Sequence, residues 1–317
     1  MRVLIDQKNL IKNTELSEVK GISRGLPRVL QVRGKNFGSH TFIIESPNAL
    51  QILLKPWIVG LELADLARKS SKNLLKVAYH LCPELRTASY NKIAEVIPLA
   101  GALYYHLGNA FEHVFHESLK QCFIGAQRKL DQHKNQWFTE LSYLNFEALP
   151  SQPVILLGDT IATGGTIQKI IKTTAETADK PQAIILFSIA GSVLGAHKLH
   201  KLERRLDLPI YSFFSNALFG VAENGTDMPW LHPATLMSTD IRYKALETYG
   251  HKLGKEWCAI WDWGERAKDP QRHLEDLLER INYYLKKTGY KNLKENLLIL
   301  KTKVKESMEK RLAPIHL

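Results

Sequence analysis

One short stretch, residues 153–167, constrains the fold of this chain more than any other. The apolar run from Val154 to Leu157 is typical of a strand that is buried on both faces of a parallel sheet. A loop with two adjacent glycines follows, and apolar residues at helical spacing begin at Ile167. The stretch therefore predicts a strand, a tight loop and the start of a helix.

The loop from Asp159 to Thr166 contains the groups that an anion-binding site needs. A helix N-terminus carries unpaired N–H groups and a partial positive charge, which attract anions. Gly164 and Gly165 allow the backbone to approach a phosphate, and Thr163 and Thr166 can donate hydroxyl hydrogen bonds to it. Asp159 precedes the loop, where a carboxylate could bind sugar hydroxyls. The alternative is an ordinary strand–turn–helix connection without a ligand.

This pattern resembles the phosphoribosyl diphosphate (PRPP) signature of type I phosphoribosyltransferases. In that family the loop holds the 5′-phosphate of PRPP, and acidic residues at the strand end hold its ribose hydroxyls. Many members have two consecutive acidic residues, whereas this chain has Gly158 followed by Asp159. The resemblance implies a catalytic role for Asp159. It also implies that PRPP is bound by Asp159, Thr160, Ala162, Thr163, Gly164, Gly165 and Thr166.

Two segments before the loop resemble the uracil phosphoribosyltransferases within that family. Ala100 and Gly101, after a predicted strand over 93–97, match a PRPP loop that faces pyrophosphate, although the arginine of that loop is absent here. Arg128 ends a predicted strand and matches an arginine that contacts PRPP phosphates, which implies a catalytic and PRPP-binding role. The alternative for Arg128 is a surface arginine at a strand end.

The stretch 220–231 resembles, in position and partly in residues, the uracil-binding loop of the same enzymes. Trp230 stands where those enzymes have a glycine, so its indole could stack on a different or larger acceptor, or could simply be a core aromatic. Asp240 is placed loosely as a metal contact through Mg²⁺-pyrophosphate. The implied acceptor site consists of Asn224, Gly225, Asp227, Met228, Pro229 and Trp230.

Alternating strands and helices of this length predict an α/β fold, with a parallel sheet flanked by helices and ligands at the carboxyl ends of the strands. We expect residues 1–242 to form a phosphoribosyltransferase-like domain with an N-terminal hood or helical layer. Residues 47–83 have a helical pattern that Pro56 should interrupt. Residues 243–317 are expected to form a helical C-terminal extension, with Trp257, Trp261 and Trp263 as a packing cluster.

Composition narrows the partners and the compartment of the protein. The 317 residues carry a formal net charge of +11, which suits a nucleic acid, a membrane surface or a polyanionic small molecule. Three widely spaced cysteines indicate reduced thiols and a cytoplasmic location. The apolar run over 183–196 is too short to span a bilayer, and the N-terminus lacks the apolar core of a signal peptide, so no membrane association is expected.

The resemblance implies an enzyme, a pentosyltransferase that moves ribose 5-phosphate from PRPP, with Mg²⁺, to uracil or an altered nucleobase-like acceptor. Pyrophosphate would be released, and a homodimer is expected. The alternative is a PRPP- or nucleotide-binding regulator without turnover, which Gly158, the missing loop arginine and the net charge favour. Nucleic acid is a less favoured partner. A third interpretation is a phosphoribosyltransferase with an unusual acceptor.

Overall fold

The computed structural model describes residues 6–131, 136–258, 263–287 and 294–312. The strands in this part of the chain are β1 (Glu15–Glu18), β2 (Val29–Arg33), β3 (Thr41–Ile44), β4 (Ile93–Leu99), β5 (Lys120–Asp131), β6 (Gln136–Asn145), β7 (Val154–Gly158), β8 (Ala183–Ser188), β9 (Gly191–Ser192), β10 (Ile210–Ser215) and β11 (Leu218–Phe219). The main sheet orders nine of them as β1-β2-β3-β10-β8-β7-β4-β5-β6, and β9 pairs with β11. The run from β3 to β5 is parallel, and antiparallel pairs extend it at both edges.

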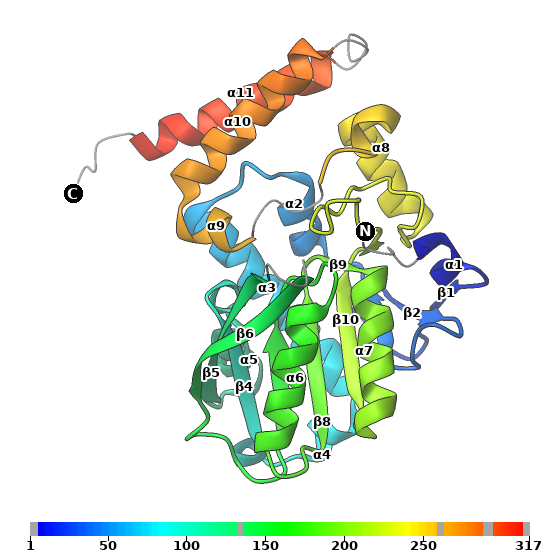
Figure 1. Cartoon of the computed structure of the whole chain (residues 1–317), viewed down its shortest axis with the longest axis vertical. Helices are drawn as coiled ribbons and strands as arrows, with labels where there is room; N and C mark the ends of the chain where they lie inside the picture. Colours follow the sequence, from blue (N-terminus) through cyan, green and yellow to red (C-terminus); the bar gives the residue numbers. More distant parts are fainter. Residues whose placement is uncertain (1–5, 132–135, 259–262, 288–293, 313–317) are drawn as a thin grey trace.

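The helices that flank this sheet form two layers. They are α1 (Gln7–Ile11), α2 (Pro47–Leu54), α3 (Gly60–Leu81), α4 (Pro83–Thr87), α5 (Leu107–Phe115), α6 (Gly165–Thr177) and α7 (Val193–Leu206), with the 3-10 turns η1 (Tyr90–Lys92) and η2 (Gly101–Tyr105). Helices α6 and α7 cover one face of the sheet, and α3, α4 and α5 lie behind the other (Figure 1). Every residue of β7, β8 and β10 is buried, so the predicted parallel α/β fold is confirmed.

The predicted break near Pro56 is also confirmed, because α2 and α3 are separate helices. The Ser46 hydroxyl caps the start of α2 by accepting a hydrogen bond from Ala49 N. Pro56 lies in the connection that follows Leu54, where the chain turns between the two helices. This connection is the surface on which the C-terminal helices dock.

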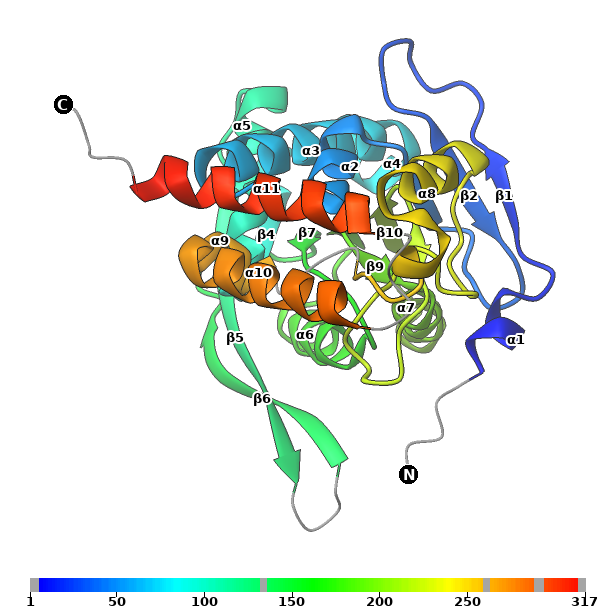
Figure 2. The same cartoon turned by 90° about the horizontal axis from the view of Figure 1, so that it is seen from above.

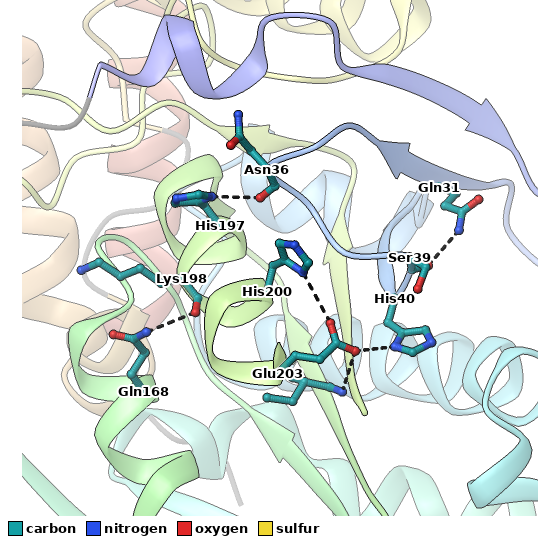
Figure 3. A network of polar contacts seen from close by, with 10 residues as sticks. Gln31, Asn36, Ser39, His40, Gln168, His197, Lys198, His200 and Glu203 are labelled. Atoms are coloured by element: carbon teal, nitrogen blue, oxygen red, sulfur yellow. Dashed lines mark hydrogen bonds and ion pairs between the residues drawn. The ribbon is translucent and has the colours of Figure 1, made fainter. Parts of the chain in front are cut away.

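Helix α7 is fixed to the neighbouring elements by polar contacts (Figure 3). Nδ1 of His197 donates to the carbonyl oxygen of Asn36 at 2.9 Å, and Nδ1 of His40 lies 2.5 Å from Oε1 of Glu203. Nε2 of Gln168 in α6 donates to the carbonyl oxygen of Lys198 at 3.1 Å. These contacts place α7 firmly against α6 and the β2–β3 connection, beside the glycine loop.

The C-terminal part consists of α8 (Thr239–Gly254), α9 (Trp263–Lys268), α10 (Pro270–Lys286) and α11 (Lys294–Leu312). Asp269 caps α10 by accepting a hydrogen bond from Arg272 N. Helices α9, α10 and α11 lie above the carboxyl ends of the strands, with α10 and α11 side by side (Figures 1 and 2). The predicted helical extension is therefore confirmed, although Trp261 lies outside the described residues.

Arg266 fastens these helices to the body of the protein. Its side chain is completely buried, and its guanidinium donates hydrogen bonds of 2.9 Å to the carbonyl oxygens of Ile52, Lys55 and Ile58. The last carbonyls of a helix lack partners within the helix. A cation at the end of α2 provides donors for them and interacts favourably with the negative end of the helix dipole. Burial lowers the pKa of Arg266 to about 9, which still leaves it charged at neutral pH.

Two further side chains of the extension bind the same connection. Nε2 of His273 in α10 donates to the carbonyl oxygen of Pro56 at 2.8 Å, and the Ser307 hydroxyl in α11 donates to that of Trp57 at 2.7 Å. Burial lowers the pKa of His273 to about 4, so the imidazole is neutral at pH 7. Residues of the extension and of the body share one apolar core. The domain boundary after residue 242 stays a prediction.

The remaining compositional expectations concern cysteines and membranes. The three cysteines are free and buried. Among the helices of the described segments, none has the length together with the apolar character that crossing a membrane requires.

Replacing Arg266 by methionine should strongly destabilise the protein. Arg266→Met leaves three carbonyl oxygens in the core without a donor, so we expect the free energy of unfolding to fall by about 3–5 kcal/mol. Urea denaturation followed by circular dichroism measures this change. The matched control is Arg205→Met on the exposed side of α7, which should change stability by less than about 0.5 kcal/mol. Equal stabilities of the two variants would contradict the anchoring role.

Candidate functional site

A cavity of about 940 Å³ lies at the carboxyl end of the parallel strands. Thr160 and Ala162, from the loop that follows β7, line one side, and residues 226–228 line another. Helices α9 and α10 contribute most of the remaining wall. We call this helical side the roof, and it includes Trp263, Arg272, Asp276, Glu279, Arg280 and Tyr284. The cavity occupies the end of the sheet at which parallel α/β folds bind ligands.

Asp159 is delivered to this region by β7. Its N–H donates to the carbonyl oxygen of Phe187 in β8 at 3.0 Å, and its Oδ1 accepts from Thr160 N at 2.8 Å. Burial raises the pKa of Asp159 to about 7, against the opposing effect of the hydrogen bond from Thr160 N. A bound cation or a hydroxyl donor would stabilise the charged form of such a carboxylate.

The loop after Asp159 is held by residues 190–192, which include β9. Ile161 N donates to the carbonyl oxygen of Ala190 at 3.1 Å, and Ser192 N donates to that of Ile161 at 2.9 Å. The Ser192 hydroxyl donates to the carbonyl oxygen of Ala162. These contacts fix the loop through its backbone.

The two adjacent glycines serve different purposes in the loop. Gly164 has a φ of +72° as the N-terminal cap of α6, a conformation that strongly favours glycine. A Cβ placed on Gly165 would meet no heavy atom within 4 Å, so open space lies at the first turn of α6. Free N–H groups that face such a space can receive a phosphate. The geometry of Thr163 to Thr166 is compatible with the predicted phosphate loop.

The β5–β6 hairpin lies against the same helix start. The Thr166 and Thr139 hydroxyl oxygens are 3.3 Å apart, and Thr139 in β6 is paired with Arg128 in β5. The backbone of Arg128 is therefore one cross-strand pair away from the glycine loop. The Arg128 side chain and residues 132–135 lie outside what the structure describes, so the phosphate contact of Arg128 stays a prediction.

Packing explains why position 158 is a glycine. A Cβ at this position would lie 2.8 Å from Cγ and 3.0 Å from Cβ of Tyr105. Tyr105 is the last residue of η2 and is completely buried. Its ring fills the space that a side chain at position 158 would need. The chain therefore cannot carry a second acidic residue beside Asp159 without displacing Tyr105.

The predicted pyrophosphate loop, Ala100 and Gly101, connects the end of β4 to the roof. The peptide bond that precedes Ala100 is cis. Nε1 of Trp263 in α9 donates to the carbonyl oxygen of Gly101 at 3.0 Å, and the Trp263 ring lies 5.3 Å from the Tyr105 ring. Tyr105 in turn reaches Thr160, so this loop, the loop after Asp159 and the roof are in direct contact.

The predicted acceptor loop presents part of its residues to the cavity. Oδ1 of Asn224 accepts from Thr226 N at 3.1 Å and from Asp227 N at 3.0 Å. This turn, which includes Gly225, brings Asp227 and the largely buried Met228 to the cavity lining. Asp227 also lies 3.7 Å from Arg280 in α10, which ties the loop to the roof.

Trp230 is corrected by the structure. Its side chain has no exposed surface and packs edge-on against the Phe219 ring at 5.3 Å, so it belongs to the core and does not line the cavity. Pro229 is buried as well and forms a β-bridge with Cys258. The acceptor side of the cavity therefore comes from residues 226–228, and the core-aromatic interpretation describes Trp230.

The predicted metal contact of Asp240 is also corrected. Asp240 is exposed in the first turn of α8, which Ser238 caps, and an acidic residue there is favoured by the helix dipole. The pKa of Arg28 is raised mainly by its hydrogen bond to Glu18 and also by the charge of Asp240, which places Asp240 near β2 and outside the cavity lining. Among the described residues, no group of three or more His, Cys, Asp or Glu is arranged to hold a metal ion.

The roof itself was missed by sequence reasoning. Arg272 lies 3.8 Å from Glu265, and the other roof residues alternate between acidic, basic and aromatic side chains. The buried apolar residues of α10, such as Leu274 and Ile281, recur at helical spacing, but such periodicity does not reveal that another side of the helix faces a cavity. The only sequence signal was the tryptophan-rich segment immediately before α10.

Comparisons with known proteins give matches among solved structures only. No family model matches the chain, and no curated protein matches it. Adenine phosphoribosyltransferase from Trypanosoma brucei, in complex with AMP, pyrophosphate and ribose-5-phosphate, is similar with 10% identity and a TM-score of 0.37, covering 73% of this chain and 99% of that one. Adenine phosphoribosyltransferase from Leishmania donovani has 16% identity and a TM-score of 0.35, covering 65% and 96%.

A hypoxanthine-guanine phosphoribosyltransferase from Bacillus anthracis has 12% identity and a TM-score of 0.29, covering 41% of this chain and 68% of that one. These structural neighbours are type I phosphoribosyltransferases. They are adenine and hypoxanthine-guanine enzymes, so the resemblance to uracil enzymes stays a prediction. Similarities at these identities and scores leave the functional argument to the geometry of the site.

The packing of Tyr105 on Gly158 predicts an asymmetry between two glycines of the site. Gly158→Ala forces a Cβ into the Tyr105 ring, so we expect the free energy of unfolding to fall by about 1–3 kcal/mol. Gly165→Ala is the matched control, because its Cβ would enter open space and should change stability by less than about 0.5 kcal/mol. Thermal unfolding of both variants measures the difference. An equal effect at the two positions would show that Tyr105 does not enforce Gly158.

Proposed function

We propose that the protein transfers the ribose 5-phosphate unit of Mg²⁺-bound PRPP to a nucleobase-like acceptor and releases pyrophosphate. One observation carries this proposal. A single cavity brings the loop after Asp159 to face the loop over 226–228, at the end of the sheet where ligands bind. The lining residues from the first loop are Thr160 and Ala162, and the proposed phosphate loop over 163–166 follows them directly in the chain. A transfer between two bound substrates requires a site for the donor next to a site for the acceptor.

The chemistry to be accelerated is a problem of charge. The bond from the anomeric carbon to pyrophosphate breaks while a bond to an acceptor nitrogen forms, and that nitrogen loses its proton. Positive charge develops on the sugar and negative charge on the leaving group, so fixed groups that match these charges lower the barrier. In the proposal, the backbone and hydroxyls over 163–166 bind the 5′-phosphate, and the Asp159 carboxylate holds the ribose.

The leaving pyrophosphate would be met by Mg²⁺, by the loop of Ala100 and Gly101 and by Arg128. Mg²⁺ enters as part of the substrate, held by the oxygen atoms of PRPP, which are the ligands this ion prefers. Its contribution is to neutralise the charge of the leaving group. The chain supplies Asp159 as the nearby carboxylate that a cation would favour in its ionised form.

The acceptor would lie against Asp227 and Met228, beneath the roof. Uracil is the acceptor that the sequence resemblance favours. Purine bases are the alternatives. A second candidate function is PRPP binding without turnover, and the replacement of an acidic side chain by the Tyr105 ring beside Gly158 favours it.

The test is pyrophosphate release from PRPP and Mg²⁺ with uracil, adenine, guanine and hypoxanthine in turn. Release that depends on one of these bases would support the proposal and identify the acceptor class. PRPP binding by calorimetry without release would favour the non-catalytic function. Absence of PRPP binding would contradict both.

Neutralising Asp159 should slow the transfer. Asp159→Asn removes one charge-assisted contact to the ribose, which is worth about 1.5–3 kcal/mol, so we expect kcat/KM to fall roughly ten- to a hundredfold. Steady-state kinetics measure the change, and circular dichroism confirms folding. An unchanged kcat/KM in the folded variant would remove Asp159 from the site.

The raised pKa of Asp159 predicts a pH dependence of PRPP binding. Below about pH 7 the free protein carries the neutral acid, and a proton must be lost before the carboxylate can bind ribose or the substrate's cation. Affinity for PRPP should therefore fall about tenfold between pH 8 and pH 6, since each pH unit below the pKa costs a factor of ten. Calorimetry across this range measures it.

Asp159→Asn is the control, because PRPP itself also titrates in this range. The variant should keep only the pH dependence that comes from PRPP. Identical pH profiles for the two proteins would contradict the role of Asp159.

A further inference from the structure

The Tyr105 side chain contacts three parts of the site: the end of β7, the loop after Asp159 and the roof. Its ring packs on Gly158 and lies 5.3 Å from the Trp263 ring of the roof. Its hydroxyl oxygen is 3.2 Å from Ile189 N and 3.2 Å from the Thr160 hydroxyl. No part of the side chain is exposed, whereas Thr160 lines the cavity. Tyr105 therefore acts on a ligand only through the groups that it holds.

One hydrogen bond at Tyr105 has a defined direction. An amide N–H can only donate, so the phenol oxygen accepts from Ile189 N. Its own proton can then go to the Thr160 oxygen at 3.2 Å or to the Ser188 side chain, which also contacts the phenol. We consider the arrangement in which it goes to Thr160. Burial raises the pKa of the phenol, which keeps that proton in place. The Thr160 oxygen then acts as an acceptor toward Tyr105, and its own proton is left to donate into the cavity. This chain of hydrogen bonds runs from Ile189 N through Tyr105 to Thr160, which lines the cavity.

Many type I phosphoribosyltransferases have two consecutive acidic residues at this strand end, whereas here a hydrogen-bond donor lies beside a single carboxylate. A carboxylate at position 158 could only accept hydrogen bonds from a ligand. The Tyr105 ring excludes a side chain there, and the Thr160 hydroxyl offers a donor instead, beside the acceptor oxygens of Asp159. One donor and one acceptor at adjacent positions match a sugar phosphate, which has both oxyanions and hydroxyl groups.

We propose that Tyr105 is a positioning residue that holds the Thr160 hydroxyl as a hydrogen-bond donor to an oxygen of the sugar-phosphate substrate. The proposal rests on the proposed function, since it assigns Thr160 to PRPP. Tyr105 is well fixed for this task. Its carbonyl oxygen accepts from the Ser71 hydroxyl at 2.6 Å, and its ring meets the Phe187 ring edge-on at 5.6 Å. A donor that is oriented before the ligand arrives loses little freedom on binding.

The experiment is a double-mutant cycle on PRPP binding. Calorimetry with PRPP and Mg²⁺ compares the wild type, Tyr105→Phe, Thr160→Val and the double variant. Each single variant should weaken binding about three- to tenfold, which is the loss of one neutral hydrogen bond. The double variant should bind PRPP with about the same affinity as whichever single variant binds it less tightly. Both changes interrupt the same chain of hydrogen bonds, so their effects should not add.

Two controls separate positioning from general damage. Tyr104→Phe removes a hydroxyl one residue earlier in η2 and should leave PRPP affinity unchanged. Thr160→Ser keeps the donor and should retain most of the affinity. Circular dichroism reports folding, and if Tyr105→Phe does not fold, the difference between Thr160→Val and Thr160→Ser decides whether the hydroxyl is the binding group.

The outcomes distinguish the two levels of the argument. Wild-type binding that is lost in Asp159→Asn but unchanged in Tyr105→Phe would overturn the role of Tyr105 and leave the proposed function intact. Additive losses in the double variant would overturn the chain from Tyr105 to Thr160. Absence of PRPP binding by the wild type would overturn the proposed function, and the role of Tyr105 with it.

Discussion

The buried guanidinium of Arg266 is the contact on which the site depends. It satisfies three carbonyl oxygens around the end of α2, and in doing so it fixes the start of the C-terminal helices above the sheet. Without that anchor the extension would lose three buried hydrogen bonds, and only the contacts of Trp263, His273 and Ser307 and the apolar packing described above would hold it over the strand ends. Helices α9 and α10, which Arg266 helps to fix in place, supply most of the cavity lining.

The Tyr105 ring limits which side chains the end of β7 can carry. The Tyr105 ring takes the space beside β7, so position 158 is reduced to glycine and Asp159 is left as the carboxylate at the strand end. The same ring contacts Trp263, whose indole binds the Gly101 carbonyl. The roof, the loop at Gly101 and the loop after Asp159 are thus linked through the buried rings of Tyr105 and Trp263.

The sequence was sufficient for the parts of the fold that short-range patterns control. The apolar run over 154–157, the glycines that follow and the break at Pro56 each act locally, and each was predicted correctly. Trp230 and the roof depend on contacts between distant segments, which periodicity does not encode. Trp230 packs on Phe219, and the backbone around Trp230 is hydrogen-bonded to residues 254–257. Asp240 lies in the first turn of α8, away from the cavity lining.

The most direct test of the account is an experimental structure of the protein with ribose 5-phosphate and pyrophosphate bound with Mg²⁺. The account predicts the 5′-phosphate against the backbone N–H groups over 163–166, in the open space at Gly165, with the ribose hydroxyls at Asp159. A sugar phosphate bound elsewhere in the molecule, or bound in the cavity with its phosphate against the roof arginines, would contradict it.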